Sequence, residues 1–374
     1  MKSSPLPKGF ALEELLRVYF LQNGFYVLRG VPYKLNGDDL TDIDLWLYER
    51  STGTSRRVLI CDAKFKQRPK AIERLFWTKG VGDSLKVDGI FVATTDKRDS
   101  LQIMAKRLGI HLIDGDDIQR IKNNPLSKID RRLSSEEFVL LLRKADKVAH
   151  NKMMEEAQQD VLASILEGFG IISAVRSLDW FSKIAAKVVT CHPNSETALA
   201  SGRLAFFFAS ILCQSLDFIS VNAILRPIAE LKQLMLNALR YGALGTVDSS
   251  QMFNFSKLLI ERYSPGGKAT ANMIEIAFTK DLESIPADII VDQAIKTAVG
   301  GSLFNVGMQL EKIAYANNLI NFDMLPSQAK SMIGAMLDYS SVSRQKFAES
   351  WESPIMEEVV AEDGNKSQEF KLKP

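Results

Sequence analysis

The sequence predicts an α/β domain with a central mixed sheet flanked by helices, followed by a mostly α-helical domain. Residues 8–122 alternate amphipathic helical segments with short β-rich runs, whereas the chain from Ser134 onward has helical periodicity almost throughout. The length of 374 residues also exceeds the size at which a single core usually stops growing. We therefore expect domains at residues 1–125 and 134–350, with a disordered polar tail at 357–374.

The first domain begins with a helix over residues 8–23. Its apolar side chains are spaced to form one face, and Asn23-Gly24 ends it, because both residues tolerate the left-handed conformation that terminates helices. A short strand is expected over Phe25–Arg29. Asn36-Gly37 then predicts a turn before the next strand.

The following segments predict both antiparallel and parallel strand pairs. Ile43–Tyr48 and Arg57–Phe65 are β-rich, and the polar connection Ser51–Ser55 between them is typical of a hairpin. Helices and strands then alternate: a helix at about 70–80, a strand at Gly89–Ala93, a helix at Ser100–Leu108 and a strand at Ile110–Ile113. Because strands joined by helices are parallel neighbours, the complete sheet is expected to be mixed.

The helical domain follows a break at Asn123-Asn124-Pro125. Ser134 and Glu137 have the spacing of a capping box, which predicts a long helix toward Gly168. Further helical segments are expected at about 194–241, 249–263, 288–299, 302–318 and 325–349.

One apolar run, Leu204–Leu225, has the length of a membrane span. It carries Gln214, Asp217 and Asn222, which are costly in lipid, so we interpret it as a buried helix of a bundle. The N-terminus lacks the continuous apolar run of a signal peptide, and three cysteines are too few for a disulfide framework. These features favour a cytoplasmic protein without a membrane partner.

Charge is distributed unevenly along the chain. Residues 1–133 hold 24 basic and 17 acidic side chains, a balance of +7, whereas the remainder has a balance of −5. A nucleic-acid partner and a chance unevenness of the solvated surface explain this equally well. Neutralisation of N-terminal carboxylates by a metal ion would make the surface more attractive to a polyanion.

Four ionic side chains of the first domain form a pattern that suits a divalent metal. Asp44 lies on one predicted strand, Asp62 and Lys64 on the next, and Glu13 on the first helix. Residues two apart on a strand point to the same face, so Asp62 and Lys64 are directed to one point. We expect Asp44, Asp62 and Glu13 to bind Mg²⁺, with Mn²⁺ as a substitute, because the ligands are all oxygen. Lys64 would hold the attacking water and offset charge on a phosphate.

Each of these assignments has a rival. Asp42 lies on the same strand face as Asp44, and Glu14 is turned by about 100° from Glu13 on the helix. For Asp62 and its neighbouring lysine the alternative is a solvated strand face, although the apolar residues 58–61 favour a buried strand.

The arrangement resembles the PD-(D/E)xK nuclease superfamily, and within it the Mrr-like restriction endonucleases and the archaeal-type Holliday junction resolvases. The resemblance covers the N-terminal third of the chain and rests on FALEELLRVYFLQNGF with Glu13, TDIDLW with Asp44, and VLICDAKFK with Asp62 and Lys64. Thr41-Asp42-Ile43 stands where the family has its proline, and Mrr-like proteins often carry glutamine in place of Asp62. The resemblance implies a restriction-endonuclease-like fold in which these four residues are catalytic.

Basic residues follow the site along the chain. Lys66, Arg68, Lys70 and Arg74 are candidates for contacts with flanking phosphates, with a solvated charged face as the alternative. No glycine-rich segment has the lysine and the strand-to-helix context of a phosphate-binding loop, so no NTP is expected.

Together these features predict an Mg²⁺-dependent endonuclease that hydrolyses phosphodiester bonds of DNA. Because Mrr-like enzymes act in restriction, the resemblance implies a role in restriction or antiviral defence, with DNA repair or junction resolution as the runner-up. A nuclease-like scaffold that binds nucleic acid without cleavage is a further alternative. Residues 134–350 are expected to sense a target or to form a homodimer, since a single-site nuclease needs two copies to cut both strands.

Overall fold

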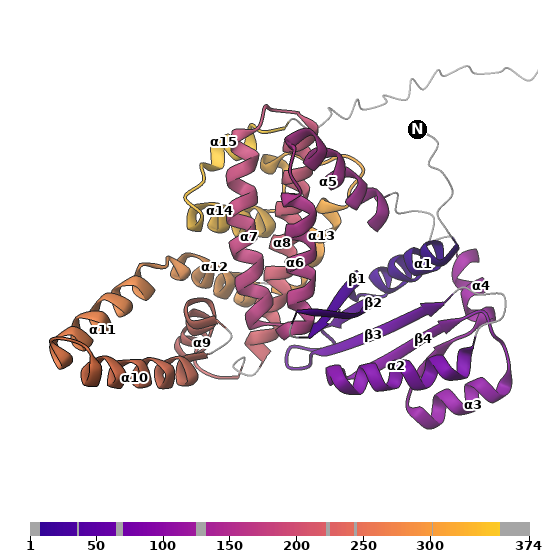
Figure 1. The fold of residues 1–374 in the computed structure, drawn as a ribbon. Coiled ribbons are helices and arrows are strands. Elements are labelled where there is room, and N and C mark those ends of the chain that lie inside the picture. Colours follow the sequence, from indigo (N-terminus) through magenta and orange to yellow (C-terminus); the bar gives the residue numbers. More distant parts are fainter. Residues whose placement is uncertain are drawn as a thin grey trace, which may run out of the picture.

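The computed structural model describes residues 8–35, 37–64, 70–124, 132–221, 225–242, 245–300 and 302–351. Its N-terminal part is a five-stranded mixed sheet with helices on both faces, and the rest is helical (Figure 1). The predicted layout of an α/β part followed by a helical part is confirmed. The predicted tail at 357–374, and residues 125–131 between the two predicted domains, lie outside the described residues.

The elements of the N-terminal part follow the predicted order. They are α1 (Lys8–Gln22), β1 (Tyr26–Leu35), β2 (Asp38–Glu49), β3 (Arg57–Lys64), α2 (Ala71–Leu85), β4 (Gly89–Thr94), α3 (Asp99–Leu108), β5 (His111–Ile113) and α4 (Gly115–Asn123). Gly24 follows α1 with a φ of +85°, and Gly37 precedes β2 with a φ of +92°. Side chains rarely adopt this conformation, so the two predicted breaks lie where glycine is required.

The strands are arranged in the order β1-β2-β3-β4-β5. The first three pair antiparallel through hairpin connections, and β3, β4 and β5 pair parallel through α2 and α3. The parallel neighbours are those joined by helices, as predicted.

Both faces of the sheet are covered. Leu45, Leu47 and Cys61 point to the face on which α1 and α4 pack. Trp46 and Ile60 point to the opposite face, which packs against α2 and α3 and, over β1, against α6 (Met153–Gly168) of the helical part. The sheet and the helical part therefore share a continuous core.

Two features of the N-terminal part differ from the prediction. The strand expected at Phe25–Arg29 extends to Leu35, because β2 pairs with it along this whole length. The prediction also contains no counterpart of α4. Its start is set by a capping box in which Asp114 accepts from the backbone N–H of Asp117, and Asp117 accepts from that of Asp114. The Asp114-to-Asp117 spacing is the sequence signal for this helix.

The helical part also contains breaks and helices that the sequence did not reveal. Its elements are α5 (Ser135–Ala149), α6, α7 (Ile171–Thr190), α8 (Glu196–Ser220), α9 (Ile228–Tyr241), α10 (Gly245–Tyr263), α11 (Gly267–Ser284), α12 (Ala287–Gly300), α13 (Leu303–Ala314), a 3₁₀ turn (Phe322–Met324), α14 (Ser327–Tyr339) and α15 (Arg344–Ala348). The capping box of Ser134 and Glu137 is confirmed, but the helix ends at Ala149, where His150 has a left-handed φ of 53°. The predicted segment 194–241 divides into α8 and α9, since Pro227 cannot continue a helix. α7 and α11 have no counterpart in the prediction.

α8 is the central helix of the bundle and contacts α5, α7 and α13. By length and composition it is the one candidate for a membrane span among the described residues, yet 94% of its 18-residue apolar window is buried inside the protein. Its polar side chains have protein partners: Gln214 donates to the carbonyl of Phe304 at 3.0 Å, and Asp217 accepts from Tyr48 at 2.7 Å. The interpretation of a buried bundle helix is confirmed.

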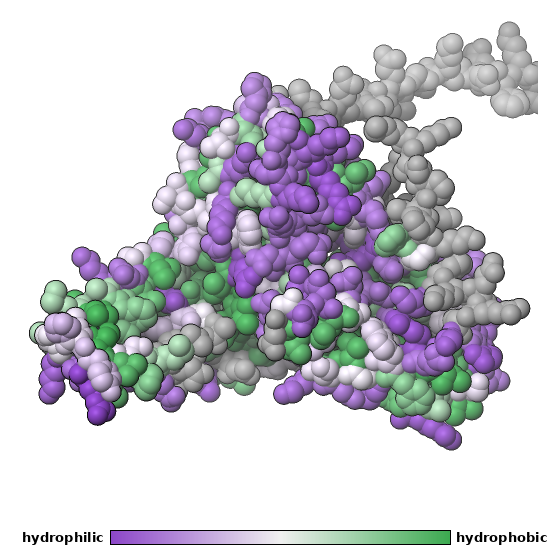
Figure 2. Space-filling view, viewed as in Figure 1, coloured by the Kyte–Doolittle hydropathy of each residue, from purple (hydrophilic) through white to green (hydrophobic). Residues whose placement is uncertain are grey.

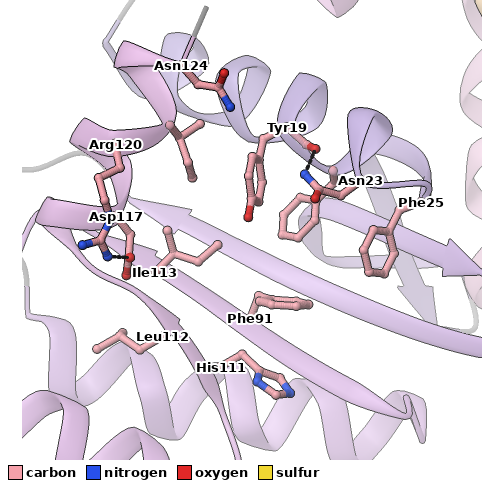
Figure 3. Close-up of a pocket in the computed structure, with 12 residues that line it drawn as sticks. Tyr19, Asn23, Phe25, Phe91, His111, Leu112, Ile113, Asp117, Arg120 and Asn124 are labelled. Atoms are coloured by element: carbon pink, nitrogen blue, oxygen red, sulfur yellow. Dashed lines mark hydrogen bonds and ion pairs between the residues drawn. The ribbon is translucent and has the colours of Figure 1, made fainter. Parts of the chain in front are cut away.

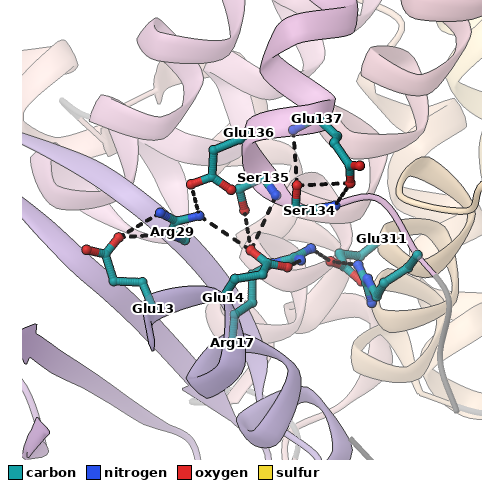
Figure 4. A network of polar contacts seen from close by, with 10 residues as sticks. Glu13, Glu14, Arg17, Arg29, Ser134, Ser135, Glu136, Glu137 and Glu311 are labelled. Atoms are coloured by element: carbon teal, nitrogen blue, oxygen red, sulfur yellow. Dashed lines mark hydrogen bonds and ion pairs between the residues drawn. The ribbon is translucent and has the colours of Figure 1, made fainter. Parts of the chain in front are cut away.

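Buried ion pairs join α1 to the helical part (Figure 4). Arg17 of α1 donates to Glu311 of α13 at 2.8 Å and to Glu14 at 2.6 Å, and Arg132 pairs with the same Glu311. Glu14 also accepts from Ser135 at the start of α5 at 3.3 Å. These contacts place α5 and α13 beside the helix that carries a candidate catalytic residue.

Candidate catalytic and metal site

The candidate site lies where β2 and β3 separate. These strands pair as far as Leu45 and Cys61, after which β2 continues along β1 and β3 continues along β4. Asp44 and Asp62 are the first residues past the last pair, one on each strand. The fork therefore brings two carboxylates together where backbone hydrogen bonds no longer close the gap between the strands.

Both carboxylates make specific contacts at the fork. Oδ2 of Asp44 accepts from the backbone N–H of Ala63 at 2.7 Å. Asp62 is only 5% exposed and forms an ion pair with Arg74 of α2, with Nε and Oδ2 2.9 Å apart. A cavity of about 10 Å³, about the space of one water molecule, is lined by both aspartates and Trp77. The burial of Asp62 argues against the solvated strand face that was its alternative.

Glu13 approaches the same region from α1. Arg29 of β1 lies between Glu13 and Glu136 of α5; its Nε donates to Glu13 at 2.9 Å (Figure 4). Burial raises the pKa of Glu13, the charge of Arg29 opposes this, and the charge of Asp44 adds to it. Glu13 is therefore coupled to Asp44, while Arg29 holds its carboxylate.

Lys64 completes the cluster of charges. It is partly buried, and its positive charge lowers the pKa of both Glu13 and Asp44. Burial nevertheless raises the pKa of Asp44 above its ordinary value. Neighbouring, partly buried carboxylates with raised pKa values favour the binding of a cation, either a proton or a metal ion.

The three predicted metal ligands are not assembled as a metal site. Within the described ranges, no group of three or more histidine, cysteine or acidic side chains is arranged to hold a metal ion. The reason is that Arg29 and Arg74 hold the carboxylates of Glu13 and Asp62. The donor set is nonetheless the all-oxygen set that Mg²⁺ prefers, and the raised pKa of Asp44 fits an added cation. The residues fit a metal ion provided that it displaces these arginines, and the metal stays a prediction.

The predicted phosphate contacts divide into two groups. Lys66 and Arg68 lie outside the described residues. Lys70 directly precedes α2 and pairs with Glu73 of that helix at 3.2 Å. Both side chains are exposed, so the amine of Lys70 is accessible to a phosphate. Arg74 is directed to Asp62, and its guanidinium lies 4.3 Å from the ring centroid of a neighbouring tryptophan.

The surroundings of the rival residues differ from those of the candidates. Asp42 is exposed and lines the same small cavity as Asp44. Glu14 is directed to the helical part. Burial raises its pKa, but the charges of Arg17 and Arg29 and the hydrogen bonds from Arg17 and Ser135 together lower it below the ordinary value. A carboxylate with a lowered pKa and a permanent buried partner is suited to a structural ion pair. The geometry therefore favours Glu13 over Glu14 for the site.

A larger hollow lies away from these residues, at the β5 edge of the sheet (Figure 3). This cavity of about 520 Å³ is lined by aromatic side chains, including Tyr19, Phe91 and His111. Arg120 and Asp117 on its rim pair with each other. None of the four candidate catalytic residues lines it.

Comparisons with protein-family models, with curated proteins and with solved structures gave no match. The resemblance to a nuclease superfamily therefore rests on the motifs in the sequence.

The sequence did not identify Arg29 as the partner of Glu13. Arg74 was predicted to contact a phosphate, whereas it pairs with Asp62. The signal for Arg29 was a lone arginine within the apolar run Tyr26–Val31, because a buried cation requires a partner. No comparable signal marked Arg74.

Proposed function

We propose that this chain is a metal-dependent endonuclease that hydrolyses DNA phosphodiester bonds, with a restriction-endonuclease-like fold in its N-terminal part. The observation that carries the proposal is the strand fork, where Asp44 and Asp62 lie on separating strands and Lys64 follows two residues later. Phosphodiester hydrolysis needs a divalent cation held by oxygen ligands and a positive charge for the phosphate. The two aspartates would supply the oxygen ligands, and Lys64 would supply the positive charge.

Each residue has a distinct role in this proposal. Asp44, Asp62 and Glu13 would hold Mg²⁺ or Mn²⁺, which when bound polarises the phosphate and lowers the pKa of a water molecule. Lys64 orients the attacking water and offsets the negative charge that develops on the phosphate oxygens. Arg74 holds the carboxylate of Asp62 when no metal ion is bound, and a metal ion would take the place of the Arg74 guanidinium.

The biological setting is proposed from the resemblance. It implies restriction or antiviral defence in the cytoplasm, with junction resolution or repair as the runner-up. A homodimer would supply two catalytic sites for the two strands of DNA.

A non-cleaving nucleic-acid scaffold is the second candidate, and one observation favours it. Arg29 and Arg74 already neutralise Glu13 and Asp62, so these carboxylates have partners without a metal ion. A scaffold of this kind would bind DNA equally well in EDTA. Metal-dependent cleavage separates the two candidates.

The test is cleavage of supercoiled plasmid, methylated and unmethylated, in Mg²⁺, Mn²⁺ or EDTA. Lys64→Ala is compared with Lys79→Ala, which removes a lysine of α2 that pairs with Asp83 on the surface. We expect metal-dependent cutting by the wild type and by Lys79→Ala, and a loss of roughly 100-fold or more in Lys64→Ala. Binding of DNA without cleavage by the folded wild type, in either metal, would favour the scaffold. Normal cutting by Lys64→Ala would contradict the site.

A further inference from the structure

Arg74 of α2 is held at the candidate site by two different groups. Its Nε donates to Oδ2 of Asp62 at 2.9 Å, and its Nη2 pairs with the other oxygen of that carboxylate. The central carbon of the guanidinium also lies over the indole ring of Trp77, 4.3 Å from the ring centroid. Positions three apart on a helix are neighbours, so α2 itself brings Arg74 and Trp77 together. A carboxylate and an aromatic ring therefore hold the same cation.

Only one of these two contacts depends on a free carboxylate. A divalent cation on Asp62 would remove the acceptor of Arg74 and repel its positive charge. The contact with Trp77 would persist, because it depends on the face of the indole ring rather than on Asp62. Tryptophan attracts a cation more strongly than the other aromatic side chains do. Trp77 would thus keep Arg74 beside the site after Asp62 has released it.

Trp77 lies at the candidate site and is open to solvent. It lines the cavity of about 10 Å³ together with Asp44 and Asp62, and it is 38% exposed. The side chain of Arg74 is 26% exposed, so its guanidinium can move without crossing the core. Figure 2 shows hydrophilic and hydrophobic side chains side by side on the surface over α2 and α3. The pair therefore lies where a polynucleotide can approach it.

The charges around Arg74 indicate the group that it would bind next. Burial raises the pKa of Asp44, and the charge of Arg74 is among the effects that oppose this rise. Arg74 therefore acts on both aspartates that are expected to hold the metal ion. A phosphate bound to that ion would lie beside the same two aspartates. The planar fork of N–H donors on an arginine matches phosphate oxygens, so the released Arg74 is suited to this phosphate.

We propose that Trp77 is a positioning residue that keeps Arg74 at the site when a divalent cation binds, so that the guanidinium passes from Asp62 to a phosphate of the bound DNA. The inference rests on the proposed function, because it requires both the cation and the DNA. The phosphate contact that the sequence predicted for Arg74 forms, in this proposal, only in the metal-bound state. Trp77 acts through Arg74 and does not itself contact the reacting atoms.

A double-mutant cycle on DNA affinity tests whether Trp77 acts through Arg74. Lys64→Ala, which is expected to bind DNA without cutting it, is the background, and Arg74→Gln and Trp77→Leu are added singly and together. At saturating Mg²⁺ each substitution should weaken the binding of a DNA duplex about tenfold, and the double variant should bind no more weakly than either single one. In EDTA, Trp77→Leu should change the affinity less than about twofold. Effects that multiply in Mg²⁺ would show that Trp77 contacts DNA independently and would overturn the proposal, as would an equal effect of Trp77→Leu in EDTA.

A second pair of the same kind supplies the matched control. Lys183 lies over the ring of Trp180 on α7, 4.5 Å from its centroid, in the helical part. Trp180→Leu should leave DNA affinity unchanged, and a loss as large as that of Trp77→Leu would contradict a role specific to the site. Trp77→Phe keeps an aromatic ring and should retain most of the affinity. Circular dichroism shows whether the variants fold, and Trp77→Gln repeats the cycle if Trp77→Leu does not.

Calorimetry with Mg²⁺ and Mn²⁺ separates this inference from the proposed function. A wild type that binds neither ion contradicts both. A wild type that binds metal and DNA but never cleaves contradicts the proposed function alone, and the cycle still decides the role of Trp77. Metal binding and cleavage by the wild type, together with independent effects in the cycle, contradict the role of Trp77 alone.

Discussion

Replacing Asp217 with alanine should remove much of the stability that joins the sheet to the helical part. Asp217 of α8 is 1% exposed and accepts hydrogen bonds from Tyr48 at 2.7 Å, from Arg50 at 3.0 Å and from Nη2 of Arg56 at 3.1 Å. Tyr48 lies on β2, and Arg56 directly precedes β3. One carboxylate therefore anchors both strands that carry the candidate site.

The size of the stability loss depends on whether the arginines that contact Asp217 keep other partners after the substitution. Arg56 has a side chain that is 2% exposed, and without Asp217 its charge has lost its carboxylate partner. Arg50 keeps Ser302 as an acceptor at 2.6 Å. Removing one partner of a buried ion pair costs about 3–5 kcal/mol, so we expect a loss of this size in the free energy of unfolding.

Asp338→Ala is the control, because the ion pair of Asp338 with Arg344 is about half exposed. Exposed pairs contribute about 0–1 kcal/mol. Urea denaturation followed by circular dichroism and by tryptophan fluorescence measures both variants. Equal losses for Asp217→Ala and Asp338→Ala would refute the reasoning that burial determines the contribution of the Asp217 contacts.

Two further predictions concern the candidate site. Because burial raises the pKa of Asp44, the folded protein binds a proton there at higher pH than the unfolded chain, and this stabilisation is lost as pH rises through the raised pKa. Asp44→Asn should thus be more stable than the wild type at neutral pH in EDTA, with a gain that shrinks on acidification; urea unfolding at several pH values checks this. Arg74→Gln should tighten Mn²⁺ binding about tenfold, since it removes a cation that competes for Asp62. Calorimetry measures the affinity, and weaker binding would speak against Asp62 as a ligand.

The strands were predictable because their signals are local. Ile43–Tyr48 and Gly89–Ala93 are short β-rich runs bounded by polar or glycine-containing connections, and both lie within strands. Boundaries inside the helical part depend on contacts between distant segments. The start of α5 is an example, because the backbone N–H and the hydroxyl of Ser135 donate to Glu14 of α1, 121 positions away in the sequence. Periodicity alone cannot reveal such a contact.

In the candidate site, too, local features were predictable and contacts between distant segments were not. Strand alternation predicted that Asp62 and Lys64 share a face, and this needs only the two-residue period. The partners of the carboxylates depend on tertiary packing: Arg29 lies 16 residues from Glu13, and it meets that residue because α1 packs on the sheet beside β1. The sequence therefore predicted the set of ionic residues without the arginines that hold them.

Arg29 also connects the candidate site to the helical part. Its side chain is 5% exposed and pairs with Glu13 at 2.8 Å and with Glu136 at the start of α5. Burial lowers the pKa of Arg29, but the two glutamates hold it above the ordinary value. A buried cation shared by two carboxylates cannot move from one without leaving a charge uncompensated. A displacement of α5 would therefore change the charge around Glu13, so this contact links the helical part to the candidate site.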